Sequence, residues 1–167
     1  SVHLHSLKKV FLLQGPMLWI VSLPIQLGQF QAEPLDLGML AWAGIGLAVI
    51  GIFFETIGDH QMAAFKADPA NHGQVMDRGL WRYTRHPNYF GEIVLWVGVA
   101  IIAIPILSGW QWVTMISPVF VTLLLTRISG IPMLEARADE KWGGQPDYED
   151  YKARTSVLIL RPPSAPR

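Results

Sequence analysis

The sequence contains no cysteine and carries little charge. Of its 167 residues, 16% are charged and 51% are hydrophobic, whereas about a quarter of the residues in a soluble domain are charged. The absence of cysteine excludes disulfides and thiol chemistry. The shortage of charge argues against an ordinary soluble domain.

Several sequence signatures of ligand binding are also missing. The chain has no Walker loop, no GxGxxG and no nucleophile elbow. It has no basic stripe interleaved with aromatic residues, so we expect no nucleic-acid partner. Among the five histidines, His60 and His72 have no cysteine or carboxylate at ligand spacing, and His3 and His5 are terminal. We therefore predict no metal site.

The missing charge is concentrated in three uncharged runs. They cover 21 residues from Val10 to Phe30, 18 from Leu37 to Phe54 and 34 from Ile93 to Thr126. A membrane-spanning helix needs about 20 apolar residues. The longest run would be roughly 50 Å long as one helix, so it must fold back near Pro105, Ser108 and Gly109. We predict an all-α, multi-pass transmembrane helical bundle with about four spans, near residues 10–30, 37–56, 89–107 and 110–130.

The basic residues fall on one side of this topology. The loops 31–36 and 106–111 contain Glu33 and Asp36 but no Lys or Arg, and all thirteen basic residues lie on the opposite side. The positive-inside rule places that side in the cytoplasm, together with both ends of this chain.

Two cytoplasmic elaborations extend one membrane domain, residues 1–163. In the loop 58–88, residues 59–67 continue the second span outward before Asp68 and Pro69 break the helix. The tail 131–163 has helical composition from Leu134 to Lys141, and we expect residues 164–167 to be disordered. Because the chain begins with Ser and has no signal peptide, we expect further spans to precede it.

Residues 78–92, RGLWRYTRHPNYFGE, hold the densest polar cluster. Pro87 is placed to open a helix, with His86 or Asn88 as its cap. The free N–H groups and the positive dipole end would attract an anion such as a phosphate. The alternative is that the arginines only contact lipid headgroups. The candidate ligand-binding residues in this segment are Arg82, Tyr83, Arg85, His86, Asn88, Tyr89 and Glu92.

Other candidates lie outside this segment. Glu92 and Arg127 reach the same depth in the hairpin of spans three and four, so they form an ion pair or hold a polar ligand. Asp59 and Lys66 are seven residues apart and share one helical face, which is either solvated or part of a site. Tyr148 and Tyr151 either cover a flat ring system or pack as ordinary aromatic residues.

Four motifs resemble the C-terminal half of the steroid 5-alpha-reductase superfamily, and more narrowly its bacterial integral-membrane branch. They are GDHQMAAFKADP, GLWRYTRHPNYFGE, RISGIPMLE and DYEDYKARTSVLI, and the resemblance covers residues 40–163. The wider group also contains the isoprenylcysteine carboxyl methyltransferases. The resemblance implies residence in a bacterial inner membrane.

In the reductases this half binds NADPH between the cytoplasmic mouth and the tail. The resemblance implies cofactor contacts at Asp59, Lys66, Asn88, Glu92 and Arg127, although many reductases have Arg where this chain has Lys66. The catalytic acid pair of the reductases lies in earlier spans and has no equivalent here. In the methyltransferases S-adenosylmethionine occupies a similar pocket, and the matching positions are Glu135, Trp142, Gly143, Tyr148 and Tyr151.

Three functions follow from these observations. The first is NADPH-dependent reduction of a carbon–carbon double bond in a lipophilic substrate, a sterol-like or isoprenoid compound. The second is a membrane methyltransferase that uses S-adenosylmethionine. The third is a non-enzymatic lipid-binding membrane protein. The basic cluster favours NADPH because S-adenosylmethionine carries no phosphate.

Overall fold

The computed structural model describes residues 14–30 and 38–164, and within them all regular structure is helical. The predicted outer loop with Glu33 and Asp36, together with the first thirteen residues, lies outside this description. Shorter 3-10 turns occur at Pro69–Asn71, Gly79–Arg82, Ile104–Ile106 and Gly109–Met115, and a π-helical turn occurs at Leu124–Ile128. The α-helices are α2 (Leu23–Gln29), α3 (Met39–Ala67), α4 (Pro87–Ala103), α5 (Ile116–Leu123), α6 (Ile131–Trp142) and α7 (Pro146–Arg154).

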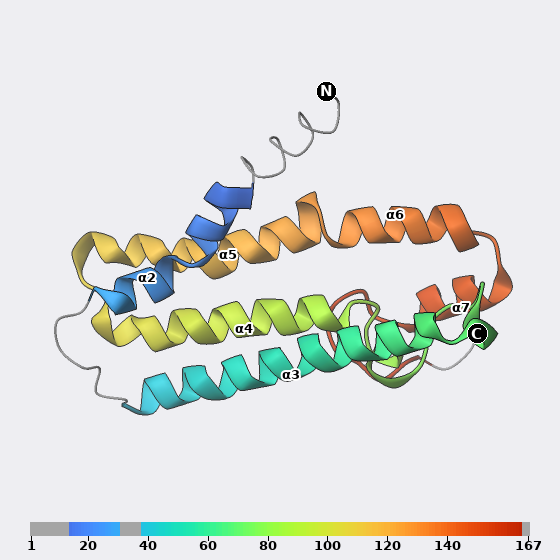
Figure 1. Ribbon diagram of the computed structural model, residues 1–167, viewed down its shortest axis with the longest axis horizontal. Helices are drawn as coiled ribbons and strands as arrows, with labels where there is room; N and C mark the ends of the chain where they lie inside the picture. The colour runs from blue at the N-terminus through green and yellow to red at the C-terminus, as the bar shows by residue number, and fades with distance from the viewer. Residues whose placement is uncertain (1–13, 31–37, 165–167) are drawn as a thin grey trace, which may run out of the picture.

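Three helical stretches of the described residues are long and apolar enough to cross a membrane. They are Met39–Ala67, Pro87–Ile106 and Gly109–Trp142, and they run side by side along the long axis of the molecule (Figure 1). The chain reverses where the sequence predicted, because Leu107 is extended and Gly109 adopts a φ of 51° that favours glycine. Helix α3 also continues outward to Ala67, as predicted.

The predicted span 10–30 is described only in part. Residues 14–21 are helical, the chain turns at Ser22, and α2 then begins with Pro24 in its first turn. A continuous helix is therefore absent from the described part of this segment, and four spans stay a prediction. The Ser117 hydroxyl donates to the Val21 carbonyl oxygen at 2.6 Å, which fixes the segment to α5.

A seam of glycines brings α3 and α4 into close contact. A Cβ atom on Gly51 would lie 2.4 Å from the backbone nitrogen of Leu95, and one on Gly91 would lie 2.4 Å from that of Glu55. Small residues at such positions let helix backbones approach within a membrane. The seam contains Gly44, Gly51 and Gly58 on α3 and Gly91 and Gly98 on α4.

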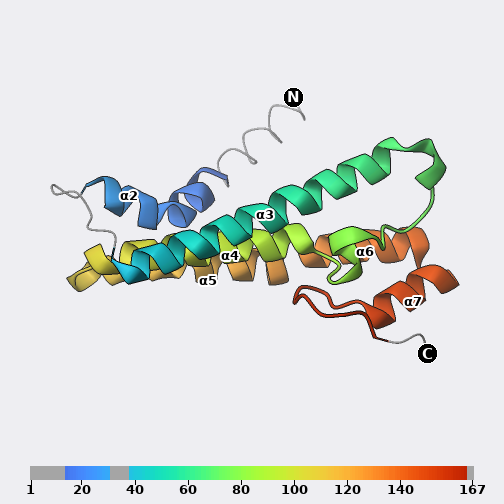
Figure 2. The same cartoon turned by 90° about the horizontal axis from the view of Figure 1, so that it is seen from below.

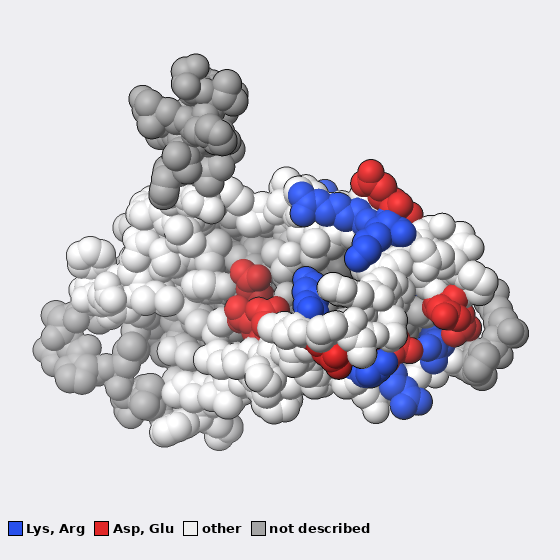
Figure 3. All heavy atoms as spheres, turned by 45° about the vertical axis from the view of Figure 1, so that its right-hand side comes forward, with Lys and Arg blue, Asp and Glu red and all other residues white. Residues whose placement is uncertain are grey.

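The charged residues gather at one end of the molecule (Figure 3). At this end the outer part of α3 diverges from α4 and α6, while α7 and the C-terminal segment lie on the opposite side (Figure 2). The described helices of the other end, residues 14–30 and 38–54, carry no charge. The charged groups of the described residues therefore lie where α3 diverges from α4 and α6 (Figure 2).

The C-terminal segment, residues 155–164, forms backbone hydrogen bonds with the loop that precedes α4. The backbone N–H of Arg85 donates to the Ser156 carbonyl at 2.8 Å, and the backbone N–H of Arg161 donates to the Tyr83 carbonyl at 3.1 Å. The N–H of Ser164 also donates to the Arg154 carbonyl at 3.1 Å. This bond ties Ser164 to the end of α7, and the predicted disorder of residues 164–167 stays a prediction. Residues 165–167 lie outside the description.

Candidate functional site

A cavity of about 650 Å³ opens at the charged end of the molecule. Its walls come from the outer half of α3, the loop 71–76, the start of α4, and helices α6 and α7. Eight of the thirteen predicted site residues line it, although they come from four separate segments of the sequence. They are Asp59, Lys66, Arg85, His86, Asn88, Glu135, Tyr148 and Tyr151.

The loop 71–76 forms the outer wall, and side-chain hydrogen bonds hold it to α3 and α6. Trp142 Nε1 donates to the Gly73 carbonyl at 3.0 Å, and Asn71 Nδ2 donates to the Phe65 carbonyl at 3.0 Å. Apolar side chains cover much of the remaining wall, so the cavity offers surfaces against which a flat ring can pack. They include Met62, Phe65, Val75, Met76, Leu134 and Trp142.

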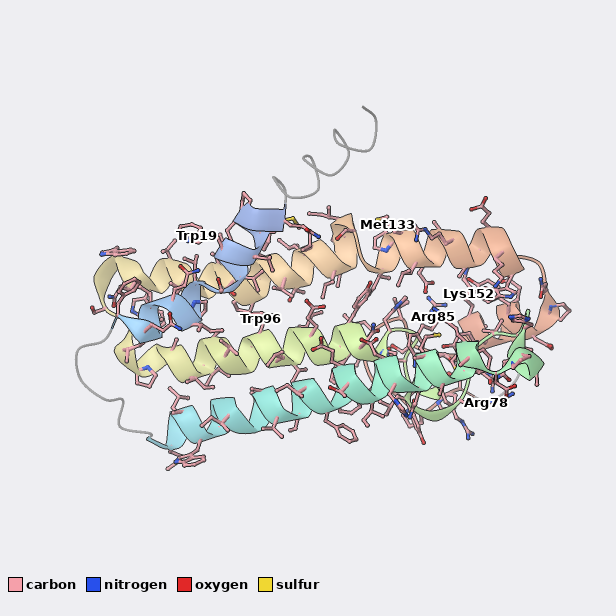
Figure 4. All side chains as sticks on the ribbon, viewed as in Figure 1. Trp19, Arg78, Arg85, Trp96, Met133 and Lys152 are labelled. Carbon is pink, nitrogen blue, oxygen red and sulfur yellow. The ribbon has the colours of Figure 1, made fainter. Side chains whose placement is uncertain are left out.

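Glu135 joins α6 to the loop that precedes α4. Its Oε2 atom lies 2.9 Å from Arg85 Nη2, and its Oε1 atom lies 2.9 Å from His86 Nε2. Arg85 Nη1 also donates to the Lys152 carbonyl at 3.3 Å. Figure 4 shows Arg85 and Lys152 in the space between α6 and α3, whereas Met133 points away from it. Helices α6 and α7 thus both contact the Arg85 guanidinium, which fixes one wall of the cavity.

The start of α4 differs from the prediction. No side chain caps the helix, because Asn88 Nδ2 donates instead to Asp59 Oδ1 at 2.9 Å and His86 is held by Glu135. The Asn88 amide therefore ties α4 to α3. The first N–H groups of α4 remain without a side-chain acceptor.

Three cations on the cavity wall have no counterion within the described residues. Lys66 comes from α3, while Arg137 and Lys141 are one turn apart on α6. No hydrogen bond or ion pair joins their side chains to another described residue. Lys141 Nζ lies only over the Trp142 ring, 4.2 Å from its centroid. The sequence reasoning missed Arg137 and Lys141, although their i, i+4 spacing beside Leu134 and Ala138 could have placed them on one face.

Five predicted site residues do not line the cavity. Arg82, Tyr83 and Arg127 are exposed, while Tyr89 stacks on His86 with ring centroids 5.6 Å apart. Glu92 is half-buried and has Glu55 and Asp59 as its electrostatic neighbours.

The predicted ion pair between Glu92 and Arg127 is wrong. No such pair forms among the described residues. Arg127 belongs to the π-helical turn Leu124–Ile128 and is exposed, while Glu92 lies near Glu55 on α3. Equal depth in a hairpin fixes the height of two side chains but not the direction in which each one points.

Tyr148 and Tyr151 line the cavity and also serve the packing of α7. Their hydroxyls donate to Asp139 Oδ1 at 2.6 Å and to the Trp81 carbonyl at 2.8 Å. Burial raises the pKa of both tyrosines, and the hydrogen bond to Asp139 raises the pKa of Tyr148 further. No group of three or more His, Asp or Glu in the described residues could hold a metal ion.

Comparison with known proteins gives the family of this chain. The family model described as a protein of unknown function (DUF1295) matches residues 1–155. Steroid 5-alpha-reductase DET2 of Gossypium hirsutum is 29% identical over 117 residues, which are 70% of this chain and 40% of the relative. The 3-oxo-5-alpha-steroid 4-dehydrogenase 1 of Rattus norvegicus is 29% identical over 118 residues, 70% of this chain and 39% of the relative. No solved structure matches.

The chain therefore spans about two fifths of the length of these curated relatives. The comparisons confirm the resemblance that the motifs of residues 58–92 and 127–159 indicated. The chain belongs to the DUF1295 family, within the steroid 5-alpha-reductase superfamily.

Proposed function

We propose that this chain forms the cofactor-binding part of a membrane-embedded, NADPH-dependent reductase. Its substrate would be a carbon–carbon double bond in a lipophilic molecule of the sterol or isoprenoid type. The observation that carries the proposal is the set of three cations without counterions, Lys66, Arg137 and Lys141, on the wall of one cavity.

The charge balance of this cavity favours a guest with several negative charges. Lys66, Arg137 and Lys141 are exposed, so water and salt screen their mutual repulsion, and a polyanion bound between them would attract all three. Of the other charged groups of the wall, Arg85 pairs with Glu135. Asp59 accepts a hydrogen bond from the neutral Asn88 amide and keeps its negative charge, so the three cations still outnumber the one anion that has no cationic partner. NADPH carries phosphates for the cations and flat rings for the aromatic wall.

Each part of the wall has a distinct task in this proposal. The cations of α3 and α6 bind the phosphates, and the Arg85–Glu135 pair fixes the geometry of the α4 wall. NADPH supplies the hydride when bound, while the protein orients it. The α3–α4 pair extends from the cavity into the uncharged half of the molecule, which allows a lipophilic substrate to approach from the membrane.

One observation supports the alternative of a methyltransferase. Four of the five positions that match the methyltransferase pattern line the same cavity, namely Glu135, Trp142, Tyr148 and Tyr151, whereas Gly143 does not. S-adenosylmethionine has no phosphate, and its single carboxylate is a counterion for at most one of the three cations. The two cofactors therefore differ in their need for Lys66, Arg137 and Lys141.

Ligand-induced thermal stabilisation of the purified, detergent-solubilised full-length protein tests this proposal. NADPH should raise the melting temperature by mass action, and Lys66→Ala, Arg137→Ala and Lys141→Ala should each weaken its affinity about tenfold, about 1.4 kcal/mol. Arg161→Ala is the matched control, because Arg161 is exposed and outside the cavity. Stabilisation by S-adenosylmethionine alone would favour the methyltransferase. A response to neither, with binding to anionic vesicles, would favour the lipid-binding protein.

A further inference from the structure

His86 has a buried ring nitrogen that the fold leaves without a partner. The residue is only 4% exposed, and its ring is fixed by stacking on Tyr89 and by Glu135 on its Nε2 side. The Nδ1 atom has no hydrogen-bond partner in the described residues. Such buried polar atoms are uncommon in native proteins and require an explanation. His86 is among the residues that line the cavity, so a ligand bound there is a candidate for the missing partner.

The neighbours of Glu135 determine the chemistry of this nitrogen. Both carboxylate oxygens are engaged, one by Arg85 and one by His86. A carboxylate held by a guanidinium is ionised and can only accept hydrogen bonds. His86 Nε2 must therefore carry the proton. In the neutral ring Nδ1 is then left as an acceptor with a free lone pair.

Two ordinary uses of this lone pair do not apply. His86 occupies the position before α4, but its side chain does not cap that helix. In this neutral form an anion is not a partner of Nδ1, because a phosphate oxygen and an imidazole lone pair repel each other. The partner of Nδ1 must be a hydrogen-bond donor, such as a hydroxyl or an amide N–H.

We propose that His86 Nδ1 accepts a hydrogen bond from a hydroxyl or amide N–H of the bound nucleotide, and that Glu135 is the positioning residue that fixes this tautomer. The inference rests on the proposed function for the identity of the nucleotide. The cavity then has two parts with different chemistry. Lys66, Arg137 and Lys141 bind the phosphates, and His86 binds a neutral polar group of the ribose or of the nicotinamide amide.

Four variants of the full-length protein test this division through NADPH affinity, measured by titration in detergent. His86→Phe removes the acceptor and should weaken binding about tenfold. His86→Asn places an amide oxygen near the position of Nδ1 and should retain affinity within about threefold, whereas His86→Gln, whose amide extends toward Glu135, should lose about tenfold. His60→Phe is the control, since His60 is exposed and outside the cavity.

Glu135→Gln separates a positioning role from direct contact. A glutamine amide can donate to Nε2, which moves the ring proton to Nδ1 and removes the acceptor. The side-chain ¹⁵N spectrum of His86 should show an unprotonated Nδ1 in the wild type and a protonated Nδ1 in Glu135→Gln, with a matching loss of affinity. A merely structural role of Glu135 would not move this signal.

The outcomes distinguish this inference from the proposed function. If the wild type binds NADPH and His86→Phe or His86→Gln binds it equally well, the inference is overturned while the reductase stands. If only S-adenosylmethionine binds and His86→Phe weakens it, the reductase fails while His86 remains the acceptor for a ribose hydroxyl. If the wild type binds neither nucleotide, or its Nδ1 is protonated, the inference fails.

Discussion

The two ends of this molecule are held together by different interactions. At the uncharged end α3 and α4 meet through glycines, and backbone atoms of one helix approach those of the other. At the charged end polar side chains join segments that are distant in the sequence. Every ion pair of the described residues is formed by side chains within the range 77–154. A membrane offers no hydrophobic driving force between helices, so close packing replaces it there.

This difference bears on how each end responds to change. A close-packed seam has no space for an added side chain, and large apolar residues such as Trp42 and Phe53 on the same helix already face outward. The polar end instead surrounds a cavity, so single contacts can be lost without collapse of the helix pair. Substitutions at the uncharged end should therefore affect the whole fold, and substitutions at the charged end should act locally.

Gly51→Leu should have the largest effect, because its side chain has to enter the seam. The Cβ atom alone would lie 2.6 Å from the Gly91 carbonyl oxygen and 2.4 Å from the Leu95 nitrogen, so the helices must separate. Overpacking a core costs about 1–3 kcal/mol, and displacement of backbone atoms should bring this variant to the upper limit or beyond. Unfolding by denaturing detergent, followed by circular dichroism, measures the loss.

Gly46→Leu is the matched control for this seam. Gly46 lies on the same helix, but a Cβ atom placed there meets nothing within 4 Å. Leucine is also the better helix former by about 0.8 kcal/mol. The control should therefore be neutral or slightly stabilising. Equal destabilisation by both variants would mean that the glycine seam does not hold α3 and α4 together.

Trp142→Phe should have a smaller and local effect at the charged end. It removes the hydrogen bond from Nε1 to the Gly73 carbonyl, which contributes about 1 kcal/mol. Hydrogen exchange of residues 71–76 should accelerate by about fivefold, while exchange within the seam of α3 and α4 stays unchanged. Trp110→Phe is the control, because Trp110 is 76% exposed at the uncharged end. Faster exchange throughout the protein would contradict a local role for this contact.

Helix positions could be predicted from the sequence, because they depend on local signals. Charge-free length identified α3 and α4, and Pro105 with Gly109 identified the reversal between α4 and α5. The turn at Ser22 escaped prediction since the whole segment is uncharged, and hydrophobicity alone does not report a break.

Membership of the cavity could be predicted only in part. Arg82 and Arg85 are three residues apart in the same basic cluster, yet only Arg85 reaches Glu135. The difference arises from the 3-10 turn Gly79–Arg82 and from the C-terminal segment that binds the backbone of Tyr83 and Arg85. Those contacts join residues more than 70 positions apart, and no local pattern encodes them.

Tyr151 gives the smallest predicted effect, visible only in alkaline solution. Burial raises the pKa of its hydroxyl above the ordinary value of 10.0. The folded state therefore keeps the neutral form where the unfolded state begins to ionise. This contribution to the free energy of unfolding is complete below pH 10 and is lost as the pH rises above it, by less than about 1 kcal/mol near pH 10.5.

Denaturant titrations between pH 8 and 11 on Tyr151→Phe check this sign. The variant should lose stability at pH 8, since it lacks the hydrogen bond to the Trp81 carbonyl, but its stability should fall less steeply above pH 10 than that of the wild type. Some slope must remain, because a hydrogen bond to Asp139 raises the pKa of Lys152 and this lysine acts with the same sign. An identical slope for Tyr151→Phe would mean that this hydroxyl is accessible to water. Water would then enter the polar end beyond the cavity, whereas the seam of α3 and α4 is closely packed.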